Sequence, residues 1–177
     1  MKHESFDTTL NISDTDISFE KIYQKPYIPA EYMDDIKKAN LLIIPNEGFR
    51  DAGDVVFPET TREFFDFIRE TAENGVVADI AISDEDFQRI ELHSALIELA
   101  TVIVESPLFD IAINLIASFL YDLVKKYRRK PEETSAKVKI ISEETETKKS
   151  KIITYEGPVS GVKDTLFQAS KDLFSKD

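Results

Sequence analysis

The chain has 177 residues, of which 42% are hydrophobic and 32% are charged, so its composition predicts a folded domain with a sizeable core. It carries no cysteine, which excludes disulfides, thiolate metal sites and a cysteine nucleophile. The net charge of −12 disfavours duplex DNA and anionic membranes as partners, because both are negatively charged. The first residues are polar and acidic, so we expect no secretory signal and a cytoplasmic protein.

Residues 1–29 are predicted to form an irregular segment. They are rich in Asp, Ser, Thr and Asn, whose side chains compete with helix formation by bonding to the nearby backbone. Scattered apolar residues could still supply a short strand or a clasp over the core. Pro29 then begins a predicted helix over 30–38, with acidic residues near its start and lysines near its end.

Residues 41–82 have the pattern of a βαβ unit. The apolar run 41–44 is typical of a strand that is buried on both faces. A capping box at 60–63 begins a helix that ends near Asn74 and Gly75, and 76–82 predicts the next strand. A strand, a helix and a strand in this order predict a parallel, right-handed crossover.

Residues 84–130 are predicted to form a helical hairpin, although its first arm is ambiguous. Residues 90–93 alternate like a strand, whereas Leu92, Leu96 and Leu99 keep helical spacing, and we favour a helix over 87–105. Ser106 and Pro107 break the chain, and 108–128 is the most strongly predicted helix.

Residues 137–174 predict a β-hairpin and a final helix. Strands at 137–141 and 151–155 flank the charged run 142–150, and the helix covers 161–174. The elements together predict a single α/β (α+β) domain over 1–177 with a small mixed sheet.

The helix over 108–124 suggests a protein interface. Polar residues recur every four positions and drift by about 40° per step, which makes a polar stripe about 120° wide. The remaining arc is wider than the apolar face of about 100° that a surface helix needs, so this helix is buried on two sides or meets a protein partner or a second copy. Two Asp residues in the stripe disfavour a membrane span. The interface candidates are Leu115, Ile116, Phe119 and Leu120.

The loop 46–54 is the alternative site, for a small molecule or a metal ion in a sensor or an enzyme. It follows the carboxyl end of a predicted buried strand, where open α/β sheets bind ligands. Paired carboxylates there could hold Mg²⁺ or act as acid and base, unless the loop is merely solvated. The candidate residues are Asn46, Glu47, Arg50, Asp51, Asp54, Asp79 and Asp84.

The remaining patterns favour a protein that is not an enzyme and needs no cofactor. The glycines at 48 and 53 lack the Lys-Ser/Thr of a phosphate loop, and His3 and His93 are too isolated for a zinc site or a hydrolytic triad. A basic patch could contact RNA or an anionic membrane, or simply stabilise the end of a helix. This patch consists of Lys125, Lys126, Arg128, Arg129 and Lys130.

The order of elements over residues 107–177 resembles the effector-associated constant components of prokaryotic conflict systems. An apolar helix is followed by the basic segment 125–130, two charged strands, the run 155–158 and a short helix. The resemblance implies a non-enzymatic accessory protein that works beside a defence effector. It does not cover the N-terminal half of the chain.

Overall fold

The computed structural model describes residues 8–46, 56–72, 75–82, 89–90 and 96–174. In chain order the elements are β1 (Thr9–Thr15), α1 (Phe19–Tyr23), the 3-10 turn η1 (Ala30–Tyr32), α2 (Met33–Lys38), β2 (Leu41–Ile44), β3 (Phe57–Pro58), α3 (Thr61–Thr71), β4 (Ala78–Ile80), β5 (Arg89–Ile90), β6 (Ile97–Glu98), β7 (Thr101–Glu105), the 3-10 turn η3 (Ser106–Leu108), α4 (Phe109–Lys126), β8 (Ser135–Glu143), β9 (Ser150–Pro158), the 3-10 turn η4 (Val159–Gly161) and α5 (Val162–Asp172).

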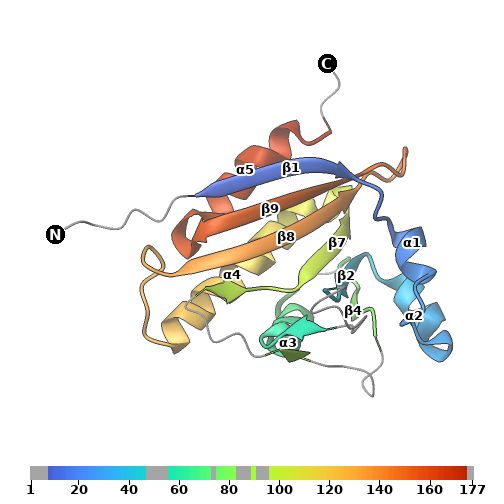
Figure 1. Ribbon diagram of the computed structural model, residues 1–177, viewed down its shortest axis with the longest axis horizontal. Coiled ribbons are helices and arrows are strands. Elements are labelled where there is room, and N and C mark those ends of the chain that lie inside the picture. Colours follow the sequence, from blue (N-terminus) through green and yellow to red (C-terminus); the bar gives the residue numbers. More distant parts are fainter. Residues whose placement is uncertain (1–7, 47–55, 73–74, 83–88, 91–95, 175–177) are drawn as a thin grey trace.

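A seven-stranded mixed sheet organises the fold (Figure 1). Its order is β1-β9-β8-β7-β2-β4, and β6 pairs with β8 beside β7. β7 and β8 are parallel, as are β2 and β4, whereas β1, β9 and β8 are joined antiparallel. The predicted class, an α+β domain with a mixed sheet, a long apolar helix and a C-terminal hairpin plus helix, is therefore confirmed.

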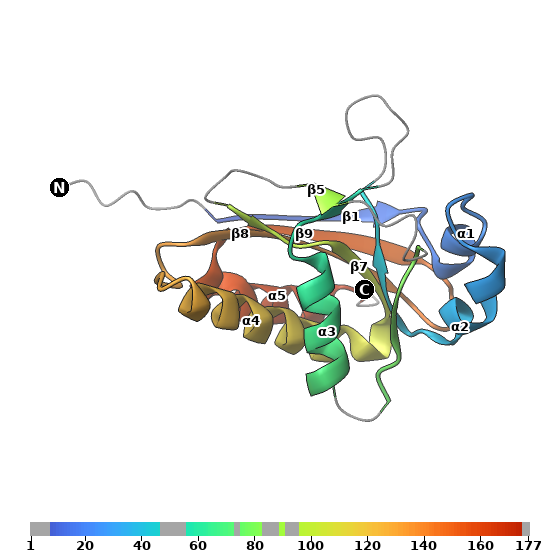
Figure 2. The same ribbon diagram turned by 90° about the horizontal axis from the view of Figure 1, so that it is seen from below.

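Helices cover the two faces of the sheet unequally (Figure 2). α3, α4 and α5 pack on one face, where alternate residues such as Val102, Ile140 and Ile153 form the main core. The intervening residues, among them Leu42 and Ile103, face the other side and pack with the short helices α1 and α2. Beyond those two helices, the described residues leave Lys139 of β8 and Ile152 of β9 only partly buried on this second face, which we call the open face.

The βαβ unit at 41–82 is confirmed, but the capping box is not. β2 and β4 are parallel, with Leu41 opposite Ala78, and α3 connects them. Thr60 makes no side-chain cap, since its ψ of 2° is not the extended backbone that a capping residue needs. Its hydroxyl lies 3.5 Å from the Glu98 carbonyl oxygen instead, and the Thr61 hydroxyl donates to the Pro58 carbonyl at 2.6 Å.

Two sequence predictions in the N-terminal two thirds are wrong. The segment 1–29 is not irregular, since it contains the helix α1 and the strand β1, although a short strand was one of the expected possibilities; the full ladder of β1 with β9 outweighs local side-chain competition. The helix expected over 87–105, and with it the helical hairpin over 84–130, is not formed in the described part of 87–105, which holds the strands β5, β6 and β7 instead. β7 is apolar on both faces because each face meets a core cluster: Val102 and Val104 lie in the main core, and Ile103 packs with α1 and α2 on the other side. Such a run hides the strand period.

The C-terminal half follows the prediction closely. The strands extend into the predicted loop, so the turn shrinks to residues 144–149, where the Glu144 N–H donates to the Lys149 carbonyl at 2.8 Å. The Tyr155 hydroxyl donates to the Pro158 carbonyl at 2.6 Å and fixes the corner between β9 and α5. A Cβ at Gly161 would lie 2.8 Å from that hydroxyl oxygen, so the corner needs glycine there.

Candidate functional site

The predicted interface on α4 lies inside the domain's own core. Leu115, Ile116, Phe119 and Leu120 are all at least nine-tenths buried. The Phe119 ring lies 5.1 Å from the Phe64 ring of α3, and α5 packs along α4 as well. The wide apolar arc is therefore buried on two sides by this chain.

The polar stripe of α4 faces solvent, as predicted. Asp110, Asn114, Ser118 and Asp122 are all exposed. By length and composition the segment Ser106–Lys126 is the one described helix that could cross a membrane. Most of its apolar side chains are buried against α3, α5 and the sheet, as in a core helix.

The residues predicted at the loop site are only partly described. Glu47, Arg50, Asp51, Asp54 and Asp84 lie outside the described residues, as do His3 and His93. Asn46 and Asp79 are described but have separate roles. The Asn46 N–H donates to the Val56 carbonyl at 2.8 Å, whereas the Asp79 carboxylate accepts from the Ile80 N–H at 2.8 Å within β4. Among the described side chains, no cluster of three acidic or histidine groups could hold a metal ion.

Asn46 also lines a cavity of about 380 Å³ on the open face of the sheet. Its floor is apolar and includes Ile141 and Ile152, while Lys139 and Glu98 bring opposite charges to the lining. The alternation of residues along β8, which places Lys139 on this face, could be predicted from the sequence. The position of β6, and hence of Glu98, could not be predicted.

A second cavity, of about 360 Å³, lies between α1 and the ends of β7 and β8. The buried Glu143 carboxylate accepts from the Phe19 N–H at 3.1 Å. Burial, and then the negative charges of Glu143, Glu20 and Glu105, raise the pKa of the Tyr23 phenol. The Lys37 Nζ lies 5.8 Å from the centre of the Tyr23 ring, so the cavity lining carries a cation as well as the carboxylates.

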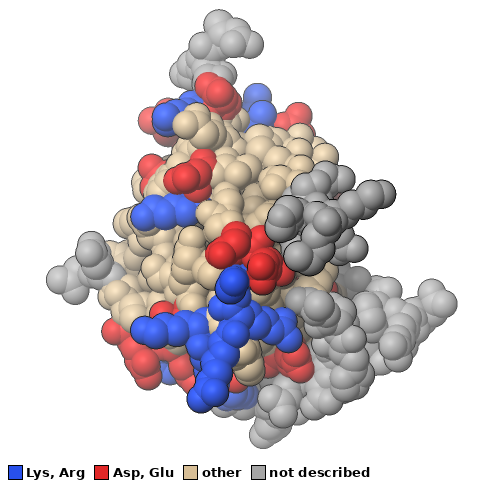
Figure 3. All heavy atoms as spheres, turned by 90° about the vertical axis from the view of Figure 1, so that its left-hand side faces the viewer, with Lys and Arg blue, Asp and Glu red and all other residues tan. Residues whose placement is uncertain are grey.

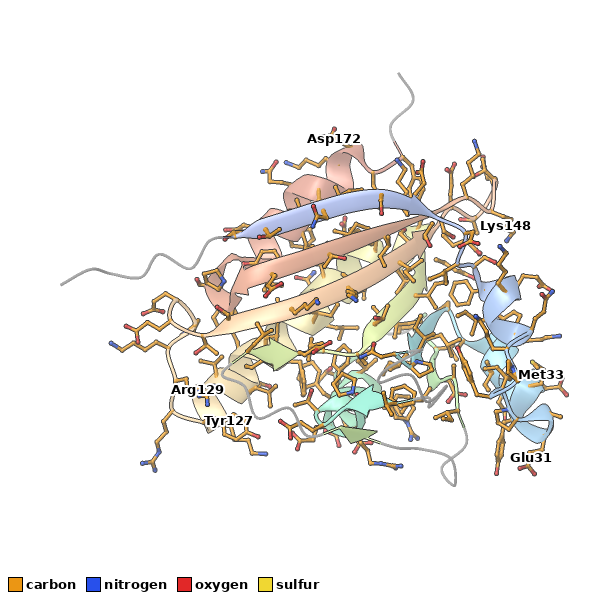
Figure 4. The ribbon with its side chains drawn as sticks, viewed as in Figure 1. Glu31, Met33, Tyr127, Arg129, Lys148 and Asp172 are labelled. Atoms are coloured by element: carbon orange, nitrogen blue, oxygen red, sulfur yellow. The ribbon has the colours of Figure 1, made fainter. Side chains whose placement is uncertain are left out.

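The basic patch spans the last residues of α4 and the turn that follows the helix. Its five cations are exposed and gather beside acidic side chains on one face of the molecule (Figure 3), and Arg129 and Tyr127 mark the turn (Figure 4). The Arg128 N–H donates to the Lys125 carbonyl and the Arg129 N–H to the Val124 carbonyl, while Arg128 adopts a left-handed φ of 54°. This is a Schellman cap, so these cations lie where they stabilise the helix C-terminus.

The edge strand β1 is the feature that sequence reasoning missed. Within the described residues β1 pairs with β9 alone, so its outer edge is open (Figure 1). Natural edge strands are often protected by Lys, Pro or shortness, but β1 has seven residues and neither Lys nor Pro. Leu10 and Ile12 are 37% and 43% exposed on it. The edge is therefore long, uncharged at its centre and partly apolar.

The two apolar side chains of β1 share one face. Leu10 is opposite Tyr155 and Ile12 is opposite Ile153, and both of these β9 residues are in the main core. Since residues opposite each other in an antiparallel pair point to the same side, Leu10 and Ile12 continue the helix-covered face to the rim of the sheet. Asn11 and Ser13 point to the open face.

No family model matches the chain, and neither a characterised protein nor a solved structure is similar to it. The interpretation of β1 and of the cavities therefore rests on their geometry.

Proposed function

We propose that the chain is a non-enzymatic accessory protein that binds a protein partner by extending its sheet at β1. The observation that carries this proposal is an open, seven-residue edge strand with two exposed apolar side chains. An added strand gains main-chain hydrogen bonds along β1, and its alternate side chains gain contact with Leu10 and Ile12.

The other surfaces give weaker support to a function. The apolar arc of α4 is occupied by the core, so it offers nothing to a partner of the folded domain. The basic patch caps a helix, and its Lys126 Nζ lies 3.9 Å from a Glu63 carboxylate oxygen, which reduces its attraction for RNA or anionic lipid. Strand addition at β1 leaves both the apolar arc of α4 and the basic patch as they are in the folded domain.

The setting we propose is the cytoplasm of a prokaryote, in a conflict system. The resemblance to effector-associated constant components supports it, and the elements on which that resemblance rests are α4, β8, β9 and α5. These elements build the centre of the fold, and β1 is added at the free side of β9. A common core with a strand added at its edge suits an accessory protein that docks through that strand.

The test compares two variants in which lysine replaces an apolar or aromatic side chain of nearly equal exposure. Ile12→Lys puts a charge on the edge of β1, where lysine opposes strand addition. Tyr121→Lys puts the same charge on α4, at a side chain that is 42% exposed. Each variant and the parent are tagged and recovered from the native cell, bound proteins are identified by mass spectrometry, and each identified protein is purified and its binding measured by calorimetry.

We expect a partner whose affinity falls at least tenfold with Ile12→Lys and stays unchanged with Tyr121→Lys. If every identified protein binds both variants equally well, β1 is not the docking strand and the proposal is wrong. Circular dichroism of both variants confirms that the fold is retained.

A further inference from the structure

β1 is complementary to itself when two copies run antiparallel. Consider a two-fold axis that is normal to the sheet and lies midway between the two copies of Asn11. It sets Asn11 opposite Asn11 of the second copy, and Leu10 opposite its Ile12. Thr9 then faces Ser13. Because opposite residues share a face, the four apolar side chains gather at the centre of the helix-covered side, with Asp14 opposite Thr8 at its two ends, and Thr9, Asn11 and Ser13 lie on the open side. The helix-covered faces of the two copies are therefore continuous with each other, and so are the open faces.

Other registers are worse matched. Centring the pair on Ile12 sets Leu10 opposite Asp14, which places a carboxylate beside an apolar side chain. Centring it on Leu10 sets Ile12 opposite Thr8 and shortens the ladder. A shift by one residue turns the helix-covered face of one copy toward the open face of the other. The axis at Asn11 is the one that sets both copies of Leu10 opposite Ile12 and keeps both faces continuous.

The charge on β1 does not oppose this contact, although each chain carries a net charge of −12. Asp14 is the single charged residue of the strand, and its carboxylate lies 3.7 Å from Lys151 Nζ of the same chain. In the Asn11-centred register the two Asp14 residues lie at opposite ends of the pair, each beside Thr8. No like charges are opposite each other along the paired strands.

From this match we infer that the partner of β1 is a second copy of the chain, paired antiparallel with Asn11 on the two-fold axis. The inference rests on the proposed function, which places a partner at β1 without naming it. The dimer has one continuous sheet with α3, α4 and α5 of both copies on the same face. α5 runs beside this edge of the sheet (Figure 1), so the two α5 helices approach each other under the joined strands. The contact is isologous and closed, as in most homodimers.

The lack of cysteine makes the register directly testable by single-cysteine crosslinking. Opposite residues in an antiparallel pair have Cα atoms about 4.5–5.5 Å apart, which a disulfide can span. Under mild oxidation Asn11→Cys should form a crosslinked dimer at least tenfold faster than Tyr121→Cys, an exposed control on α4. A mixture of Leu10→Cys and Ile12→Cys should form the mixed dimer faster than either variant crosslinks alone.

Light scattering measures the association independently. The parent should approach double the 20.2 kDa mass of one chain as its concentration rises, and Ile12→Lys should raise the dissociation constant at least tenfold while Tyr121→Lys does not. A parent that stays monomeric, with Asn11→Cys no faster than Tyr121→Cys, overturns the inference, as does a crosslink at Ile12→Cys alone. Neither result decides the proposed function, because a different protein bound at β1 would still be recovered in an Ile12-dependent way.

Discussion

Replacing Leu120 by alanine tests whether α4 is a core helix. The Leu120 side chain is fully buried, within the main core. Truncating a buried leucine to alanine costs about 2–5 kcal/mol, from lost apolar burial and from the cavity that remains. In a domain of this size each kcal/mol moves the melting temperature by about 2–4 °C, so Leu120→Ala should lower it by about 4–20 °C.

Tyr121→Ala is the matched control, since Tyr121 is the next residue and lies on the exposed side of the same helix. Its free energy of unfolding should change by no more than about 0.5 kcal/mol. Both are measured by urea denaturation followed by circular dichroism, with mass measured by light scattering. A Leu120→Ala protein with parental stability and an altered oligomeric mass would show that α4 is an interface and that the assignment to the core is mistaken.

Three further substitutions test single features of the fold, all by urea denaturation. Arg128→Gly should raise the free energy of unfolding by about 0.5–1 kcal/mol, because Arg128 has a left-handed φ of 54° that glycine adopts without strain; a loss of stability would contradict this. Tyr155→Phe should lower it by about 1–3 kcal/mol, since the Pro158 carbonyl loses its hydrogen bond. Burial raises the pKa of the Tyr155 phenol above 10.0, so the parent loses stability as pH rises through that value more steeply than the phenylalanine variant; equal slopes would contradict this. Ser142→Ala should be neutral or stabilising by up to about 1 kcal/mol, because the buried Ser142 hydroxyl has no partner among the described residues, and a loss above 1 kcal/mol would reveal one.

The parts of the fold that could be predicted are those with a local signal. α4 has a polar stripe at helical spacing, and the β8–β9 hairpin has two apolar runs around a charged turn. β2 is a short apolar run that ends at a proline. In each case the pattern lies within about twenty residues, so no distant contact was needed to recognise it.

The parts that could not be predicted depend on distant partners. β7 lies inside the sheet and each of its faces meets a different core cluster, so both faces are apolar and its alternation is lost. β1 lies near the start of the chain and pairs with β9 near its end, so that Leu10 is opposite Tyr155. The segment's apolar residues allow a short strand, but no local pattern reveals that its partner is β9 or that its outer edge stays free, and the candidate site on β1 was therefore missed.

The most hydrophobic segment is not the one that has surface left to bind a partner. The wide arc of α4 is satisfied because the chain itself supplies α3 and α5 to its two flanks. Among the described residues nothing closes the sheet in the same way, since its order leaves β1 at one edge and β4 at the other. β4 has three residues, and a short edge strand offers few main-chain groups to a second chain. β1 offers seven residues with Leu10 and Ile12 at its rim, so any partner that extends this sheet gains most by joining at β1.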